Sequence, residues 1–396
     1  MRRSPRVLWL VTLLLAGAGL ATGLHIVLDA HDRTTGVRGD GKVFGSATAR
    51  VFTEDYDGPP VVGDELTRVP ALAPLQPGNR THHVRIDIVP QDIEIAPGVR
   101  YTAWTFGGSV PGPVLHVREG DVVDFTMKNR SASTVTIAQP WASASPFLAD
   151  LVQDTHHGPA SAVMPMPHSM DFHAGTVAPN DKWRIIMPGQ SIEFTWQANY
   201  PGVFLYHCGM APVLQHLAMG QYGVVVVSPR NGYPTDAEVA RSYVVVQSEF
   251  YLKPDEADDG LSDLDFDAAM AKRPSQVVFN GNMQALKTTP LVANAGERVR
   301  LYFNDVGPSD GTSLHIVGAI FDRVYYEGNP ANSMVGMQTV QFGASGGGVL
   351  EFIAPEEGMY TLVDHEFADA QRGAVGYIEV RSPSGAITHA SAMMAH

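Results

Sequence analysis

Cys208, the only cysteine of the chain, lies in the segment PGVFLYHCGMAPVLQHLAMGQYG (residues 201–223), directly after His207 and eight residues before His216. A thiolate and imidazoles at short spacing, with methionines nearby, are soft ligands that suit copper. The flanking FLY and VVVV runs have strand composition, so we expect these ligands on a loop between two strands. Because adjacent side chains on a strand point to opposite faces, His207 and Cys208 are expected to bind different metals.

A second cluster of ligand types lies upstream in HSMDFHAG, where His168, Asp171 and His173 are found. His168 and His173 are five residues apart, an odd separation, so on a strand they too face opposite ways. A lone buried cysteine is usually a small hydrophobic residue, and the second cluster is what argues against that reading here. Two sites are therefore predicted: His168, Cys208 and His216 for one, and His173 and His207 for the other.

The composition limits the fold and the partners. The 396 residues are enough for two or three domains, and 39 Gly, 28 Pro and many Val-rich runs indicate an all-β protein with many turns. A formal net charge of −14 disfavours nucleic acid and suits small molecules or a basic redox protein as partners. One cysteine excludes an internal disulfide, so packing and metal must stabilise the fold.

The N-terminus has the pattern of a targeting element. Arg2, Arg3 and Arg6 precede an apolar run from residue 7 to about residue 28, whose length lies between a signal-peptide core and a short membrane anchor. Residues 1–28 are therefore predicted to be a signal peptide or a membrane anchor. Either one predicts an exported protein, periplasmic or at the extracytoplasmic cell surface and possibly membrane-anchored.

An internal repeat divides the rest of the chain. EGDVVDFTMKN (119–129) matches AGERVRLYFND (295–305), and PGVFLYHC (201–208) matches EGMYTLVDHE (357–366), which aligns His207 with His365. Such a repeat of strands predicts two β-sandwiches of one topology. We expect an extended arm at 29–80, a first domain at 81–232 with an irregular insertion at 131–167, a second domain at 240–382, and a tail at 383–396. His156, His157, Met164 and Met166 of the insertion could catch copper, but an ordered surface loop is the favoured interpretation.

From about His83 to Val380 the sequence resembles the two-domain, cupredoxin-fold copper nitrite reductases of the multicopper oxidase superfamily. The motifs that carry the resemblance, in the family's order, are IAPGVRYTAWTFGGSVPGPVLHVREGD, HSMDFHAG, PGVFLYHCGMAPVLQHLAMGQYG, LHIVGAIFDRVYYEG and YTLVDHEF. The resemblance implies two tandem cupredoxin-like Greek-key β-sandwich domains. It also implies reduction of nitrite to nitric oxide, with a type 1 and a type 2 copper in each chain.

The resemblance also assigns roles to single residues. It implies a type 1 copper held by His168, Cys208 and His216, and a type 2 copper held by His173, His207 and His365, the last donated by a neighbour in a homotrimer. Asp171 and His315 match the pair that delivers protons to nitrite, and Val317 matches the apolar residue that caps the pocket. The residues agree with this chemistry, because three imidazoles leave copper an open position and a carboxylate with a histidine can act as general acids.

The chain departs from the family at the axial ligand of the type 1 copper. The family's methionine, five residues after the second histidine ligand, is replaced by Gln221, while Met219 lies two residues earlier. We expect Gln221 to be the axial ligand because the QYGVVVV strand leaves no gap, and Met219 remains the alternative.

Two other functions remain open at this stage. One is an exported type 1 copper electron carrier or copper-binding protein without catalysis. The other is a laccase-like two-domain multicopper oxidase, which the absence of a His-x-His pair in the sequence disfavours. For the reductase we expect a small redox protein as electron donor, and nitrite or another small nitrogen oxide as substrate.

Overall fold

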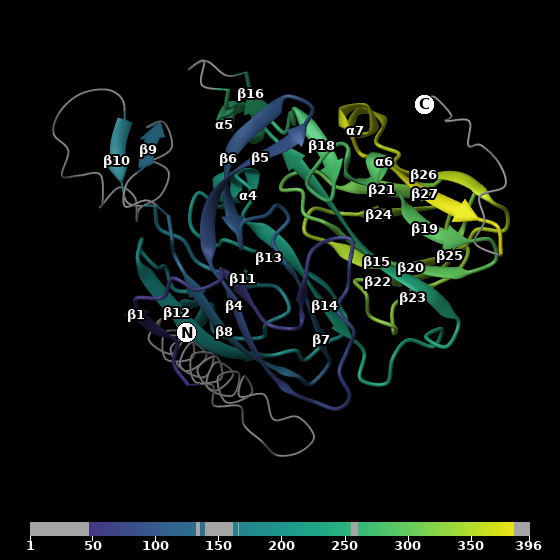
Figure 1. Ribbon diagram of the computed structural model, residues 1–396, viewed down its shortest axis with the longest axis horizontal. Coiled ribbons are helices and arrows are strands. Elements are labelled where there is room, and N and C mark those ends of the chain that lie inside the picture. Colours follow the sequence, from purple (N-terminus) through teal and green to yellow (C-terminus); the bar gives the residue numbers. More distant parts are fainter. Residues whose placement is uncertain (1–46, 132–134, 139–160, 165, 255–259, 384–396) are drawn as a thin grey trace, which may run out of the picture. The chain divides into compact units, whose positions relative to one another are not determined.

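The computed structural model describes residues 47–131, 135–138, 161–164, 166–254 and 260–383 (Figure 1). The predicted signal or anchor of residues 1–28, nearly all of the tail, and the middle of the insertion, including His156 and His157, lie outside these ranges. No helix of the described ranges is both long enough and apolar enough to cross a membrane.

Two five-stranded sheets pack together in the first domain. One sheet has the order β1 (Arg50–Thr53), β12 (Gln190–Gln197), β8 (Val122–Lys128), β4 (Thr81–Ile86) and β2 (Val61–Val62). The other has the order β11 (Asp171–Phe172), β13 (Gly202–His207), β14 (Tyr222–Ser228), β7 (Val114–Arg118) and β3 (Leu66–Thr67). Residues 50–67 of the predicted arm therefore contribute three short strands to these sheets.

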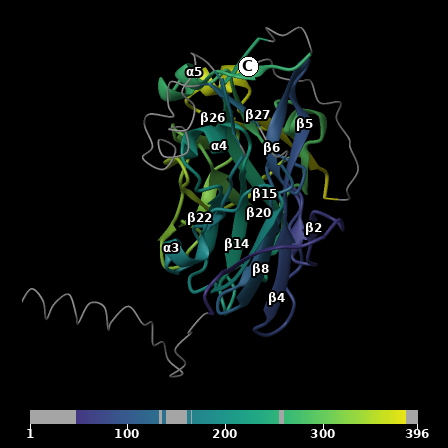
Figure 2. The same ribbon diagram turned by 90° about the vertical axis from the view of Figure 1, so that its left-hand side faces the viewer.

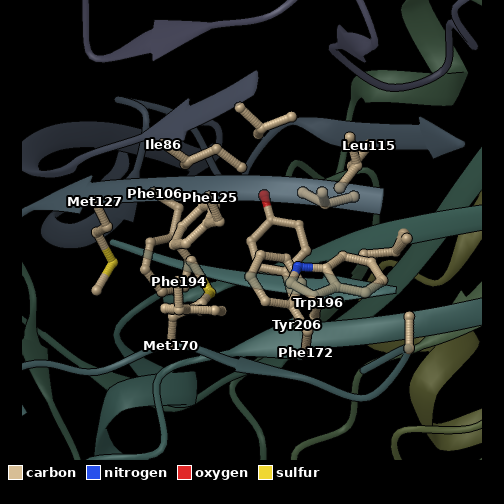
Figure 3. Close-up of a cluster of buried hydrophobic side chains, with 14 of the residues drawn as sticks. Ile86, Phe106, Leu115, Phe125, Met127, Met170, Phe172, Phe194, Trp196 and Tyr206 are labelled. Atoms are coloured by element: carbon tan, nitrogen blue, oxygen red, sulfur yellow. The ribbon is translucent and has the colours of Figure 1, made fainter. Parts of the chain in front are cut away.

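The core of the first domain follows from the period-2 pattern of its strands. In β8, Val123, Phe125 and Met127 are buried and alternate with half-buried polar positions. Such alternation places one face of a strand against the opposite sheet. Phe125 packs edge-on against Phe172 of the other sheet, with ring centroids 4.9 Å apart, inside a cluster of aromatic and aliphatic side chains (Figure 3).

The second domain repeats the two-sheet arrangement. Its larger sheet has the order β18 (Gln276–Phe279), β15 (Val239–Phe250), β20 (Arg298–Asp305), β25 (Gly347–Ile353), β22 (Phe321–Tyr326) and β23 (Ser333–Met334). Its smaller sheet has the order β19 (Leu291–Asn294), β27 (Val375–Arg381), β26 (Gly358–Asp364), β21 (Thr312–Ile316) and β24 (Thr339–Phe342).

The two domains share one strand topology. In the first, β4 runs parallel to β8, which pairs antiparallel with β12, and in the second β15, β20 and β25 repeat this order. The parallel pair β7 and β14 is likewise repeated by β19 and β27, and the next strand in each sheet is β13 or β26. The prediction of an all-β chain with two sandwiches of one topology is confirmed. The repeat makes β11, with Asp171, equivalent to β21, with His315.

Short elements complete the described chain. The hairpin β5 (Ile88–Ala96) and β6 (Val99–Phe106) lies beside helix α4 (Val213–Ala218) in both ribbon views (Figures 1 and 2). The other small sheets are β9 (Val135–Ala138) with β10 (Ser161–Met164), and β16 (Leu252–Lys253) with β17 (Asp263–Leu264). The other helices are α3 (Pro179–Lys182), α5 (Phe266–Met270), α6 (Ala285–Thr288) and α7 (Phe367–Arg372).

The domains are joined by an apolar contact. All seven residues of β14 are buried because its two faces serve different cores. Val225 and Val227 face the core of the first domain, whereas Val224 and Val226 join a cluster that includes residues of β15, β20 and β25. The sandwiches therefore share a continuous hydrophobic interface.

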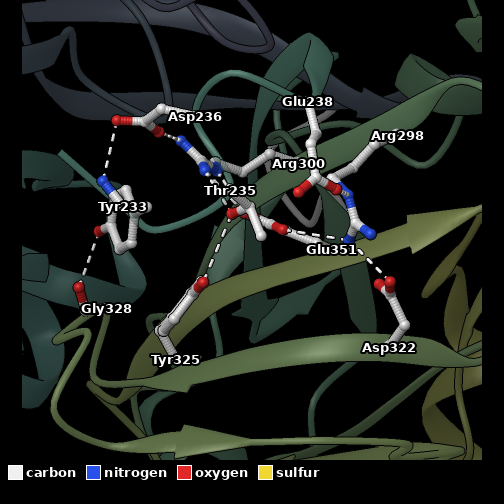
Figure 4. A network of polar contacts seen from close by, with 10 residues as sticks. All are labelled: Tyr233, Thr235, Asp236, Glu238, Arg298, Arg300, Asp322, Tyr325, Gly328 and Glu351. Atoms are coloured by element: carbon white, nitrogen blue, oxygen red, sulfur yellow. Dashed lines mark hydrogen bonds and ion pairs between the residues drawn. The ribbon is translucent and has the colours of Figure 1, made fainter.

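A polar network fixes the connection between the domains, residues 233–239 (Figure 4). Arg300 of β20 is buried, pairs with Glu351 of β25 at 2.7 Å, and also binds Asp236 of the connection. Arg298 bridges Glu238 of the connection and Asp322. Thr235 of the connection is buried as well and donates to Glu351 at 2.7 Å. Losing one partner of a buried polar contact or ion pair is strongly destabilising, so the connection is held firmly at this point.

Candidate metal centres

An inner cluster of ligand atoms brings together His168, Cys208 and His216, all of which are buried. His168 precedes β11, Cys208 directly follows β13, and His216 lies on α4. The Nδ1 atoms of the two histidines are 3.3 Å apart, and Cys208 Sγ is 3.9 Å from His168 Nδ1. The backbone N–H of Ser169 points at the sulfur from 3.4 Å, which is an environment suited to a thiolate.

Burial sets the protonation of the inner cluster. It lowers the pKa of His216 to about 4 and that of His168 well below its usual value. It raises the pKa of the Cys208 thiol to about 11. Near neutral pH both imidazoles are therefore uncharged and able to bind a metal, while the thiol keeps its proton until a metal displaces it.

Metal binding at the inner cluster is consequently linked to one proton. We expect copper to release about one proton more from the wild-type protein than from Cys208→Ala between about pH 6 and pH 9, because only the thiol must ionise. The affinity for the inner copper should then rise about tenfold per pH unit across that window. A pH indicator in weakly buffered solution measures the release. A difference of two or more protons would show that the imidazoles are charged before the metal binds.

Gln221, the predicted axial ligand, lies directly before β14. Its side chain is fully buried, and its Oε1 lies 2.9 Å from Nδ1 of His216, so the oxygen points at the ligand atoms. Its Nε2 is buried without a hydrogen-bond partner. Met219 instead packs against a hydrophobic cluster that includes Ile95 and Tyr101.

Substituting each of these two residues in turn tests which of them is the axial ligand of the type 1 copper. An amide oxygen is a harder donor than a thioether and favours copper(II), so Gln221→Met should raise the reduction potential of the type 1 copper. Met219→Leu should leave the potential nearly unchanged. Redox titration of the blue absorption measures both variants. The reverse pattern would identify Met219 as the ligand.

An outer cluster brings together Asp171, His173 and His207. The register of β11 and β13 places Asp171 opposite His207, with its Oδ2 3.8 Å from His207 Nε2. The Nε2 atoms of His173 and His207 are 3.1 Å apart. Nδ1 of His207 lies 2.8 Å from the carbonyl oxygen of Cys208, and donating a proton to it would leave Nε2 free as a ligand.

The alternation of side chains at the end of β13 separates the two clusters. His207 belongs to the outer cluster and Cys208 to the inner one, so a single peptide link joins them. Adjacent side chains on a strand point to opposite faces, so the sequence led us to expect His207 and Cys208 in different clusters.

His365 and His315 lie together elsewhere, in the second domain. His315 is on β21 and His365 directly follows β26, with ring centroids 4.8 Å apart. Phe367, whose side chain is 67% exposed, packs its ring 5.0 Å from that of His365. Val317 follows β21 and is half-buried. Among the described residues of one chain, His365 is not part of the outer cluster.

The donor atoms of both clusters fit a metal ion. In the inner cluster the two imidazole Nδ1 atoms are 3.3 Å apart, close enough for one metal ion to be held by both. In the outer cluster the two Nε2 atoms are 3.1 Å apart and could likewise share one ion. Two imidazoles, a thiolate and a weak axial oxygen are the donor set of an electron-transfer copper site, and imidazoles alone suit copper with an open position.

Trp104 was not found from the sequence. Its ring lies edge-on to both imidazoles of the inner cluster, with centroids 5.0 Å from His216 and 5.9 Å from His168. Nothing in the local pattern of β6 distinguishes this tryptophan from an ordinary core aromatic residue. Only the packing of the hairpin beside α4 brings it to the ligands.

Comparison with known proteins gives a consistent family. No family model matches the chain. The copper-containing nitrite reductase of Neisseria meningitidis serogroup A is 34% identical over 326 residues, which is 81% of this chain and 75% of that protein. The copper nitrite reductase of Nitrosomonas europaea has 34% identity and a TM-score of 0.60 over 77% of this chain and 94% of its own. A copper-containing nitrite reductase from Thermus scotoductus has 29% identity and a TM-score of 0.63, over 77% of this chain and 63% of its own.

Three findings agree on one family. They are the two-domain topology, the two ligand clusters joined through one peptide bond, and the 34% identity over 81% of the chain. This chain belongs to the family of copper-containing nitrite reductases.

Proposed function

We propose that this protein reduces nitrite to nitric oxide with one electron and two protons, releasing water, which is the nitrite-reducing step of denitrification. The observation that carries the proposal is the pair of ligand clusters joined by the peptide bond between His207 and Cys208. His168, Cys208, His216 and Gln221 would hold the type 1 copper. His173, His207 and a third histidine would hold the type 2 copper. When bound, the two coppers supply one-electron transfer and a Lewis-acid position for nitrite.

Proton delivery falls to side chains of the protein. The carboxylate of Asp171 lies beside the outer cluster, and its side chain is 26% exposed, so it can reach both solvent and a bound anion. A protonated carboxyl group at this position can donate to an oxygen of nitrite. The His315 ring is held through its Nδ1 by the carbonyl oxygen of Gln338, which leaves Nε2 to carry the second proton. Val317 would supply an apolar wall to the pocket.

The outer cluster needs a second copy of the chain. One chain supplies His173 and His207 there, whereas His365 lies with His315 and the exposed ring of Phe367 in the second domain. In the proposed assembly, a homotrimer, His365 of the partner subunit completes the type 2 site. The closed cyclic symmetry of such a ring makes three equivalent sites from one interface.

Location and electron donor complete the proposal. Arg2, Arg3 and Arg6 before an apolar run support export, to the periplasm or the outer face of a membrane, with the segment acting as a signal peptide or anchor. The net charge of −14 supports a small basic redox protein as donor.

The test uses the purified protein loaded with copper. We expect a trimer by light scattering, two coppers per chain by metal analysis, and nitric oxide at an electrode when nitrite and a reductant are added. His365→Ala should keep the type 1 spectrum, lose the type 2 copper and lose activity. A fully loaded trimer that accepts electrons and makes no nitric oxide would leave an electron carrier as the function.

A further inference from the structure

The inner cluster is sealed from solvent. His168, Cys208 and Gln221 are 0% exposed and His216 is 3% exposed. Among the four proposed ligands, a donor protein that docks above the cluster can therefore touch at most the narrow exposed edge of His216. A further group in contact with the ligands would shorten the gap between the donor and the type 1 copper.

Trp104 offers such a contact. It is half-buried on β6, so part of its side chain reaches the surface, and it contacts the imidazoles of both His216 and His168 edge-on. Among the described residues it is the aromatic side chain with contacts to both ligand rings.

The position of the indole is fixed by the fold. The backbone N–H of Trp104 donates to the carbonyl oxygen of Met219 at 2.8 Å, in the turn between His216 and Gln221. The hairpin that carries Trp104 is anchored by Tyr101 and Ala103, which pack with Phe250 and Val278 of the second domain. Backbone and core contacts thus hold the indole against the ligand loop.

We propose that Trp104 mediates electron uptake: an electron passes through its side chain from the docked donor to the type 1 copper. The inference rests on the proposed function of the inner cluster. One electron leaves the reduced donor and reduces copper(II) to copper(I), with no bond formed or broken and no proton transferred. The indole acts as the medium between them and is not itself oxidised.

The physical reason is distance. Electron tunnelling weakens steeply as the gap between donor and acceptor widens, and a ring in contact with His216 removes most of that gap. Val213, which is 39% exposed one helical turn before His216 on α4, adds an apolar contact for a docked protein. Electron-transfer encounters use small interfaces, so a few such contacts suffice.

The test measures type 1 reduction alone, without nitrite. Copper-loaded wild type, Trp104→Leu and Trp104→Phe are mixed in a stopped-flow instrument with reduced cytochrome c, a basic one-electron carrier, and bleaching of the blue absorption is followed. Trp183→Leu is the matched control, because Trp183 is a half-buried tryptophan of the same domain whose ring, among the described residues, contacts neither His168 nor His216. Because leucine leaves a wider gap for the electron to cross, we expect the second-order rate constant of Trp104→Leu to fall about tenfold, within the roughly 1–3 decades over which such rate constants vary among variants of one interface. Trp104→Phe should fall less, and the control should match wild type.

A structural role is separated by the spectrum and the reduction potential of the same samples. The proposal requires both to stay unchanged in Trp104→Leu while reduction slows. A rate within twofold of wild type would overturn it. A shift in the type 1 reduction potential large enough to explain the slower rate would also overturn it, because Trp104 would then act by maintaining the structure of the copper site. Because the assay contains no nitrite, a negative result would contradict the role of Trp104 without contradicting nitrite reduction. Conversely, a protein unable to reduce nitrite could still show the expected loss of type 1 reduction in Trp104→Leu.

Discussion

Asp171→Asn lowers nitrite turnover by about 10²–10⁴-fold while both coppers stay bound, because positioned acid catalysis is typically worth that factor. The amide keeps the size of the side chain and a hydrogen bond but cannot carry a proton. The β11–β13 pairing that places this residue opposite His207 depends on the backbone, so the metal ligands keep their positions. His315→Ala should have an effect of similar size, since it removes the second proposed proton carrier and leaves His365 in place.

Steady-state turnover with nitrite and metal analysis of each variant check this expectation. Asp124→Asn is the matched control, because Asp124 is a carboxylate of the same domain on β8, 39% exposed and paired with His83 rather than with a proposed ligand. Each active-site variant should also lose the limb of the activity–pH profile that the missing group governs. Turnover equal to that of the control in both variants would remove this proton path while leaving the reaction itself in place.

Cys208→Ala abolishes the blue colour and reduces turnover below detection with donors that deliver electrons to the type 1 copper. The variant loses the single thiolate, and a charge-transfer absorption of this kind requires it. The type 2 copper should stay, because His207 is oriented by the carbonyl oxygen of residue 208 and not by its side chain.

Copper analysis should therefore fall from two ions to one per chain, and electron paramagnetic resonance should show only the type 2 signal. Met219→Leu serves as the control that keeps its colour. A Cys208→Ala protein that retained its visible absorption would disprove the type 1 assignment.

Much of this arrangement could be predicted from local pattern. The alternation of side chains was enough to assign His207 and Cys208 to different clusters, and the repeat was enough to predict two sandwiches of one topology. The match of His207 with His365 was two residues off, because the registers place Val363 opposite His315 as His207 lies opposite Asp171. Alternation depends on strand geometry, which has a fixed period, whereas a sequence match does not fix the register of a strand. The two-residue strands β2 and β3 could not be predicted, because so short a segment carries no period and forms only against a partner strand.

The contacts of Trp104 and the burial of the ligands could not be predicted for a different reason. They depend on how the hairpin β5–β6 packs against α4 and the second domain, and sequence spacing does not encode such distances. The choice between Gln221 and Met219, and the role of residues 131–167, stay predictions.

The buried ion pair of Arg300 with Glu351, together with the contact of Arg300 with Asp236 of the connection, bears on assembly as well as on the stability of one chain. In the proposed ring, each subunit offers His173 and His207 from its first domain and His365 from its second. Any angular error between the two domains would be repeated in the same sense at every interface, and the ring would open into a spiral instead of closing. The junction of Figure 4 would thus set the angle between the two domains in the proposed trimer. Loosening it should yield incomplete assemblies that lack type 2 copper even though every ligand is present.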